Sequence, residues 1–218
     1  MPARNVFVTG ATGYLGRPLC ELLVARGHRV RALVRAGSRA KLPAGCEAVE
    51  GDALAPASYA GAIAPAEVFV HLVGVAHPSP GKAPLFRTVD LASTEAAVSS
   101  ARAVGVQRFV YVSVAMPAPV MKAYVEARAA GEAMIRASGL PATVVRPWYV
   151  LGPGHRWPLL LVPLYWLAGL FPGSRETARR LALVTRPQML RALVAAVEAT
   201  DPGMTVVDVP GIRAAPRL

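Results

Sequence analysis

The 218-residue chain has few cysteines, and its first residues lead us to expect no secretory leader. Cys20 and Cys46 are too few and too far apart in sequence for a disulfide framework or a cysteine metal site, so we expect both to be reduced and structural. The N-terminus runs directly into a strand pattern at residues 5–9, without a basic and apolar signal segment. These absences predict a cytoplasmic protein without a metal centre.

Lysine is also scarce, since only three of the 24 basic residues are lysines, and no basic run occurs. The formal net charge of +11 is typical of proteins that meet nucleic acid, an anionic membrane or a phosphorylated ligand. Because the arginines are scattered and no RNA-binding aromatic motif accompanies them, the pattern argues against nucleic acid. We attribute the charge to an arginine-rich composition and to a phosphate-bearing cofactor.

Charged residues make up only 17% of the chain and hydrophobic residues 54%, which excludes a disordered composition and predicts a sizeable core. The length suits one α/β domain, or one domain with a small appended lobe. We place a dinucleotide-binding core at residues 1–150 and a short substrate lobe, packed on the same domain, at residues 151–218.

Short β-branched runs alternate with longer Ala- and Leu-rich segments, as in βαβ units. Strands are expected at Asn5–Thr9, Arg29–Val34, Glu47–Glu50, Val68–Leu72, Arg108–Val114, Ala142–Arg146 and Thr205–Val209. Helices are expected at Leu15–Arg26, Thr88–Val104, Tyr124–Ser138 and Gln188–Glu198, followed at the end by a loose tail, Gly211–Leu218. The pattern predicts a Rossmann-type, doubly wound parallel sheet.

Three of the helix stops carry glycine, at Gly27, Gly105 and Gly139. A residue with positive φ is commonly needed at that position, and glycine adopts it without steric cost. Each stop comes shortly before a predicted strand, which supports the alternating order.

A glycine-rich turn lies between the first strand and the first helix. Gly10 permits the sharp turn, Gly13 lets the backbone approach a pyrophosphate, and Gly16 lets helix and strand pack closely. The helix N-terminus then offers N–H groups and a positive dipole end to the phosphates. We expect the turn to bind a dinucleotide, with Thr12, Tyr14 and Leu15 completing the contact.

The end of the second strand bears on the choice between NAD and NADP. An NAD site places a carboxylate there to hold the ribose 2′-hydroxyl, but residues 31–39 contain no acid. Arg35 and Arg39 could bind a 2′-phosphate, with Ser38 as a donor, because the guanidinium fork matches phosphate oxygens. The segment favours NADP over NAD, although either arginine could be an ordinary loop charge.

Further motifs follow in chain order: Gly51-Asp52, Val70-His71-Leu72-Val73-Gly74, Val89-Asp90 and Arg146-Pro147-Trp148-Tyr149-Val150-Leu151-Gly152-Pro153-Gly154. With the glycine turn they resemble the short-chain dehydrogenase/reductase superfamily over almost the whole chain. The similarity is to its extended and atypical branches: NmrA-like and complex-I-subunit-like NAD(P)-binding proteins and NAD-dependent epimerase/dehydratases.

The resemblance implies several cofactor contacts. Asp52, followed by Ala53, matches the acid that contacts adenine. Leu72, Val73 and Gly74 match the segment that passes beneath the cofactor, and Val89-Asp90 matches the start of the following helix. Pro147 belongs to the segment that lines the nicotinamide end.

The resemblance also implies catalytic residues, with departures from the family pattern. Tyr124 matches the acid/base tyrosine, but Arg128 stands where the family has lysine four residues later, and arginine keeps the charge without sharing a proton. Ser113 is followed by Val114, although the second of two small hydroxyl residues usually does the chemistry. Ser113 is the remaining candidate if the register differs by one residue. Tyr124 could instead be an aromatic that only packs against the cofactor.

Residues 157–172 carry no charge. The segment is too short and too rich in proline to span a membrane, so a helix lining a hydrophobic substrate pocket, a homodimer face and a peripheral membrane contact stay open. His155 and Arg156 before it could meet an anionic or carbonyl-bearing substrate, or could be solvated loop residues.

Three functions remain open at this point. The first is an NADP-dependent reductase, epimerase or dehydratase that acts on a small, hydrophobic carbonyl or sugar-like substrate. The second is a non-catalytic dinucleotide-binding redox sensor or assembly subunit, favoured by Arg128 and Val114. The third is a membrane-surface or protein-interaction module that uses residues 157–171.

Overall fold

Seven parallel strands form the central sheet of the computed structural model, which describes residues 2–154 and 172–217. In sheet order they are β3 (Cys46–Glu50), β2 (Arg29–Val34), β1 (Asn5–Thr9), β4 (Val68–His71), β5 (Arg108–Val112), β6 (Ala142–Val145) and β9 (Met204–Val207). The order reverses between β1 and β4, which is the point where doubly wound sheets bind their ligands. The predicted Rossmann-type sheet is confirmed.

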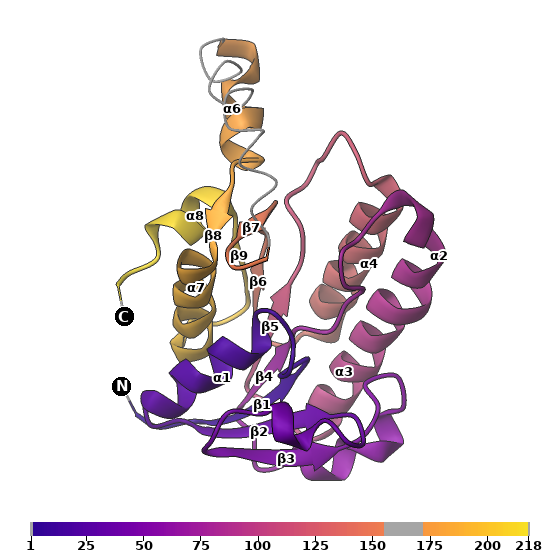
Figure 1. Cartoon of the computed structure of the whole chain (residues 1–218), viewed down its shortest axis with the longest axis vertical. Coiled ribbons are helices and arrows are strands. Elements are labelled where there is room, and N and C mark those ends of the chain that lie inside the picture. The colour runs from indigo at the N-terminus through magenta and orange to yellow at the C-terminus, as the bar shows by residue number, and fades with distance from the viewer. Residues whose placement is uncertain (1, 155–171, 218) are drawn as a thin grey trace.

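Helices cover both faces of this sheet (Figure 1). On one face lie α1 (Gly16–Ala25) and α7 (Arg186–Glu198); on the other lie α3 (Ala92–Ala103) and α4 (Lys122–Ser138). Because side chains alternate along a strand, Val110 of β5 packs in the core under α1 and α7, whereas its neighbours Phe109 and Tyr111 pack in the core under α3 and α4. Burial on both faces accounts for the nearly continuous apolar runs of the strands.

Shorter elements complete the fold. They are the single turns Arg39–Lys41, Pro56–Ser58, Ala60–Ala62 and Pro80–Lys82, the helices α2 (Ala83–Leu85), α6 (Pro172–Arg180) and α8 (Val209–Ala214), and the strands β7 (Val150–Leu151) and β8 (Val184–Thr185). β7 and β8 form a second, parallel pair, and α6 lies at the opposite end of the molecule from β3 (Figure 1). The division at residue 150 stays a prediction. Of the residues beyond it, β9 joins the central sheet and α7 covers it.

Most predicted elements occur within two residues of their expected bounds, and β1 and β2 have the expected bounds. Gly27, Gly105 and Gly139 have φ values of +84°, +71° and +73°, which confirms their predicted role at helix ends. β7 and β8 were not predicted, because strands of two residues have no periodicity to detect. His155, Arg156 and all but the last residue of the apolar segment 157–172 lie outside the described residues.

The predicted loose tail, Gly211–Leu218, is wrong in its first part, because residues 209–214 form helix α8, whereas residues 215–217 lie outside regular structure. Val209 and Ile212, three residues apart, are fully buried against the core under α1 and α7. The side chain of Asp208 accepts a hydrogen bond from the Gly211 amide at 3.1 Å and so caps the helix. The predicted strand end at Val209 fails for the same reason, because α8 begins there.

The predicted helix start at residue 88 is also wrong. Helical structure begins with α2, continues through a π-helical turn at Phe86–Leu91 and leads directly into α3. Val89-Asp90 therefore lies inside a helix rather than opening one. The wider π turn places Asp90 among the fully buried side chains, and such turns often occur at functional sites.

The burial of α8 makes it a contributor to stability. We expect Ile212→Ala to lower the free energy of unfolding by about 2–5 kcal/mol, because it removes a fully buried aliphatic side chain. Val206→Ala on β9, whose side chain is 41% exposed, is the control and should change stability by less than about 0.5 kcal/mol. Urea unfolding followed by circular dichroism measures both; equal effects would contradict the packing of α8.

Candidate cofactor and active site

The turn between β1 and α1 is held by close main-chain contacts. Gly10 has φ +76°, and a Cβ atom on it would lie 2.8 Å from the carbonyl carbon of Leu72. A Cβ on Gly16 would lie 2.1 Å from the Gly10 oxygen, and one on Gly13 would lie 3.1 Å from the same oxygen. The structure therefore has no room for a side chain at Gly10 or Gly16, as the dinucleotide-binding turn requires.

The N-terminus of α1 fits a diphosphate. No side chain caps the helix and its first turn carries no acid, while Thr12 and Gly13 are exposed. The helix thus presents the positive end of its dipole to an anion without competition from a carboxylate. Leu15 packs against the core, and the guanidinium of Arg186 lies 5.4 Å from the centroid of the Tyr14 ring.

The guanidinium groups of Arg35 and Arg39 lie just beyond β2. Both residues are exposed, and neither side chain forms a hydrogen bond or ion pair with any residue that the structure describes. The amide of Gly51 donates to the Val34 oxygen at 3.0 Å, so the adjacent Asp52 follows the neighbouring strand β3. Asp52 accepts from the Leu54 amide at 3.0 Å through its carboxylate. The predicted adenine contact therefore lies one strand away from the two arginines.

The segment after β4 continues the main-chain contacts. The amide of Leu72 donates to the Thr9 oxygen at 3.1 Å. Val73 is half-buried and Gly74 exposed. Pro147 is buried beyond the end of β6, where its oxygen accepts from the Ala115 amide at 2.8 Å. These predicted cofactor residues all lie past the carboxyl ends of their strands, at the edge where doubly wound sheets bind ligands.

Arg128 and Asp90 form a buried ion pair behind this edge. Nη2 of Arg128 lies 2.6 Å from Oδ1 of Asp90, and Nη1 donates to the Val112 oxygen at 2.9 Å. Asp90 is fully buried and Arg128 only 6% exposed. Burial disfavours the charged guanidinium, but Tyr124, Tyr111 and Asp90 favour it and hold the pKa of Arg128 above its usual value.

Tyr124 lies one helical turn before Arg128 on α4. The guanidinium carbon is 5.3 Å from the centroid of the Tyr124 ring, and Phe86 meets that ring edge-on with centroids 5.1 Å apart. Burial raises the pKa of Tyr124, while the charge of Arg128 lowers it. Because the pKa stays raised overall, the hydroxyl keeps its proton at neutral pH.

Ser113 lies on the same side of the sheet as Tyr111. Backbone bonds from Ser113 to the Val145 oxygen and from Ala115 to the Pro147 oxygen, each 2.8 Å, extend the β5–β6 pairing through residue 115. Alternation along this extended segment puts Ser113 on the face of α4 and Val114 on the opposite face. The Ser113 hydroxyl is buried and has no hydrogen-bond partner among the described residues.

The histidine of β4 is a buried neighbour that the prediction of site residues missed. Nδ1 of His71 lies 2.8 Å from the Thr9 hydroxyl, and Nε2 lies 3.4 Å from the Ser93 hydroxyl. Burial and the charge of Arg128 lower the pKa of His71 to about 3, so the ring is neutral. Asp90 was likewise missed as a partner of Arg128, because sequence places it only at a helix start.

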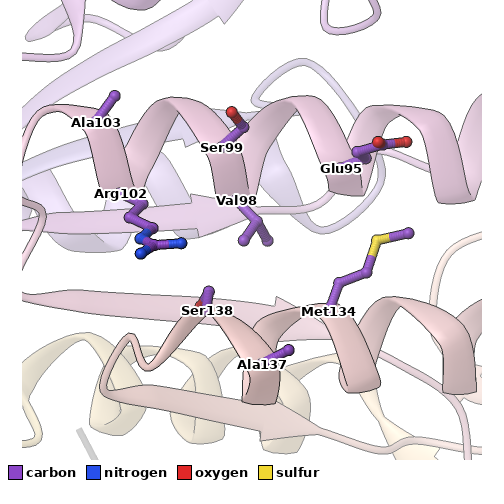
Figure 2. A pocket seen from close by; sticks show the side chains of 8 residues that line it. All are labelled: Glu95, Val98, Ser99, Arg102, Ala103, Met134, Ala137 and Ser138. Carbon is purple, nitrogen blue, oxygen red and sulfur yellow. The ribbon is translucent and has the colours of Figure 1, made fainter.

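Hollows in the described surface include one between helices and one near the sheet edge. A groove of about 580 Å³ between α3 and α4 is shown in Figure 2 and contains none of the predicted site residues. A smaller pocket of about 240 Å³ opens at the carboxyl ends of β5 and β6, lined by Ala115, Met116, Arg146, Arg180, Val206 and Asp208. Arg146 is paired with Glu132.

Within residues 2–154 and 172–217, no group of three or more His, Cys, Asp or Glu side chains is arranged to hold a metal ion. None of the helices described there combines the length and the apolar character needed to cross a bilayer.

Residues 10–155 match the model of the NAD(P)H-binding family. The chain belongs to this family. Its glycine turn, the segment after β4 and the residues around Tyr124 all fall within the matched range, so the resemblance to extended short-chain dehydrogenases/reductases is confirmed.

Two curated relatives are reductases by name. A ceramide reductase of Caulobacter vibrioides (strain NA1000 / CB15N) is 33% identical over 80% of this chain and 55% of the relative. A 3-diazoavenalumate denitrifying reductase of a Streptomyces species is 34% identical over 69% of this chain and 57% of the relative. The chain thus spans little more than half the length of these relatives.

A solved structure agrees with the fold. The enzyme WbmH of Bordetella bronchiseptica, in complex with NAD+, superposes with a TM-score of 0.70 over 93% of this chain and 75% of that chain, at 23% identity. This likeness confirms the Rossmann architecture and carries no statement about substrate.

The contact distances at Gly16 lead to a prediction. Gly16→Ala should reduce stability by about 1–3 kcal/mol and weaken NADPH binding, because its Cβ would collide with the Gly10 oxygen and displace the turn. Gly61→Ala is the matched control, since its Cβ meets nothing within 4 Å. Thermal unfolding and NADPH fluorescence titration measure both variants; an unchanged Gly16→Ala would contradict the tight turn.

Proposed function

We propose that this chain is an NADP(H)-dependent reductase of a carbonyl group in a small, hydrophobic molecule, with Tyr124 as the acid. The observation that carries the proposal is the guanidinium of Arg128 held 5.3 Å from the Tyr124 ring beside the carboxyl edge of the sheet. A fixed cation next to a phenol favours proton transfer to a carbonyl oxygen, because it stabilises the phenolate that forms.

The preference for NADP(H) is supported by the end of β2. The exposed guanidinium groups of Arg35 and Arg39 have no protein partner among the described residues, so both can bind a 2′-phosphate. Asp52, which follows β3, directs a carboxylate oxygen to its own turn. A hydroxyl-binding carboxylate, the usual mark of an NAD site, is therefore not found on β2.

Reduction is the direction that the charge state of Tyr124 supports. Its raised pKa keeps the phenol protonated at neutral pH, so the hydroxyl can donate a proton as the carbonyl becomes an alkoxide. A reduced dinucleotide held at the glycine turn would supply the hydride, and this hydride together with the proton from Tyr124 would convert the carbonyl to an alcohol. Ser113, buried without a partner on the same face, can donate to the developing oxyanion.

The hydrophobic substrate is supported by the ceramide reductase among the relatives, whose name refers to a lipid. The resemblance covers the chain from the glycine turn to the region beyond Tyr124 at the level of the family. The chain spans about half of that relative, so we propose a hydrophobic substrate without assigning the relative's own substrate to this protein.

One observation favours a second candidate, a non-catalytic NAD(P)H sensor. The cation of this site does not extend toward solvent but is paired with Asp90 at 2.6 Å and buried. Arginine at this position keeps the charge but, unlike lysine, cannot share a proton, which suits binding better than turnover.

The NADP preference predicts a selective loss on removing the two arginines. Arg35→Ala/Arg39→Ala should weaken NADPH binding about 10- to 100-fold and leave NADH binding within about twofold, because charge-assisted bonds to the 2′-phosphate are lost. Arg29→Ala at the opposite end of β2 is the control and should affect neither. Calorimetric titration decides the matter; equal losses for both nucleotides would contradict a 2′-phosphate site.

The reductase proposal predicts a catalytic loss without a binding loss. Tyr124→Phe should lower kcat for long-chain ketones and aldehydes by a factor of about 10²–10⁴ and leave the affinity for NADPH unchanged. Tyr59→Phe removes a buried hydroxyl from the core under α3 and α4 and should retain activity. NADPH oxidation at 340 nm measures both. A wild-type chain that binds NADPH but reduces none of these carbonyls would favour the sensor.

A further inference from the structure

The carboxylate of Asp90 uses both oxygens inside the protein. Oδ1 accepts from Arg128 at 2.6 Å and Oδ2 accepts from the Val75 amide at 3.0 Å. The backbone oxygen of Asp90 accepts from the Thr94 hydroxyl at 2.8 Å and from the Ser93 hydroxyl at 3.2 Å. The residue is therefore fixed at its backbone and at its carboxylate, and it joins the π-helical turn to the loop after β4.

Glycine at position 74 makes room for this ion pair. A Cβ atom there would lie 2.2 Å from Nη2 of Arg128 and 3.1 Å from Oδ1 of Asp90. With Nη1 bound to the Val112 oxygen, the guanidinium is held between the ends of β4 and β5. The segment predicted to pass beneath the cofactor thus closes directly over the cation beside Tyr124.

The charged and titratable groups around the Tyr124 hydroxyl come from several elements. Arg128 on α4 favours phenolate, whereas Asp90 on the π turn and Tyr111 on β5 disfavour it, so both raise the pKa of Tyr124. His71 on β4 stacks on Tyr111, with ring centroids 6.1 Å apart, and is neutral. Removal of the negative charge of Asp90 should therefore lower the pKa of Tyr124 if Arg128 stays in place.

A purely structural purpose accounts poorly for the pair. Replacing a buried ion pair with apolar side chains is often neutral for stability or stabilising, because both charges must leave water. Nonetheless, the carboxylate of Asp90 and the guanidinium of Arg128 are both buried here. Position 74 is a glycine, and any side chain there would collide with the guanidinium.

We propose that Asp90 is a positioning residue of the active site: it holds the Arg128 guanidinium beneath Tyr124, and Gly74 provides the space in which it does so. The inference rests on the proposed function in one respect, that Tyr124 is the acid, and deepens it by naming what places the neighbouring charge. Asp90 itself touches neither substrate nor cofactor in this assignment.

The experiment follows the ionisation of Tyr124 directly. Phenolate absorbance at 295 nm is titrated in the full chain, and the difference between Tyr124-containing protein and Tyr124→Phe isolates this one group. Asp90→Asn keeps the side-chain shape and an oxygen that can accept from Arg128 but removes the negative charge, so the Tyr124 midpoint should fall by about one pH unit. Asp90→Ala also removes the acceptor that holds the guanidinium, so its midpoint should lie above that of Asp90→Asn; equal midpoints in these two variants would mean that Asp90 does not position Arg128. Gly74→Ala pushes the guanidinium away without changing any charge, so the midpoint should rise.

Glu132→Gln is the matched control. Glu132 is another buried carboxylate. It lies on α4, as Tyr124 does, and it forms its ion pair with Arg146 rather than with Arg128. Its loss should destabilise the fold without moving the Tyr124 midpoint. An Asp90→Asn midpoint equal to the wild-type value would overturn the inference, and so would equal shifts in Asp90→Asn and Glu132→Gln. If Asp90→Asn does not fold, the direction of the Gly74→Ala shift decides alone.

Activity supplies the second readout. In a wild-type reductase, Asp90→Asn should lower kcat and move the alkaline limb of the pH–rate profile to lower pH, with KM for NADPH unchanged. If the wild type reduces no carbonyl and the phenol midpoints still shift in opposite directions, the proposed function fails while the placement of the charge by Asp90 stands.

Discussion

The site depends on the close approach of main chain to main chain at the start of α1. Gly16 lies so near the Gly10 oxygen, and Gly10 so near Leu72, that no side chain fits at either position. This contact fixes the helix against β1 and against the loop after β4 at the same time. The uncapped helix end, the Gly74 loop and the buried ion pair behind that loop are all placed relative to one another through it.

Local rules were sufficient for most of the sheet. Apolar runs such as Val68–His71 are recognisable because both faces of the sheet are covered, and Gly27, Gly105 and Gly139 mark helix ends because only glycine readily adopts their φ values. The glycine turn could be found for a related reason: its spacing reflects steric demands that act within a few residues.

Tertiary contacts determine the features that the sequence analysis predicted wrongly or left undecided. Helix α8 is stabilised by burial of Val209 and Ile212, which a short segment rich in Pro and Arg does not reveal. The direction of Arg128 depends on a carboxylate 38 residues away, and Asp90 meets it from within a π turn that the sequence does not predict. The choice between Ser113 and Val114 required the β5–β6 pairing, since a shift of one residue exchanges the two faces.

The Asp90–Arg128 pair also has a consequence at long range. Two opposite unit charges 2.6 Å apart form a small dipole, so at the distance of an approaching nucleotide they nearly cancel. If the proposed cofactor site is right, long-range attraction of a polyanionic dinucleotide would then come from uncompensated charges such as the exposed Arg35 and Arg39. Capture of the nucleotide would accordingly be sensitive to ionic strength, whereas the chemistry proposed at Tyr124, shielded from counter-ions, would hardly respond to it.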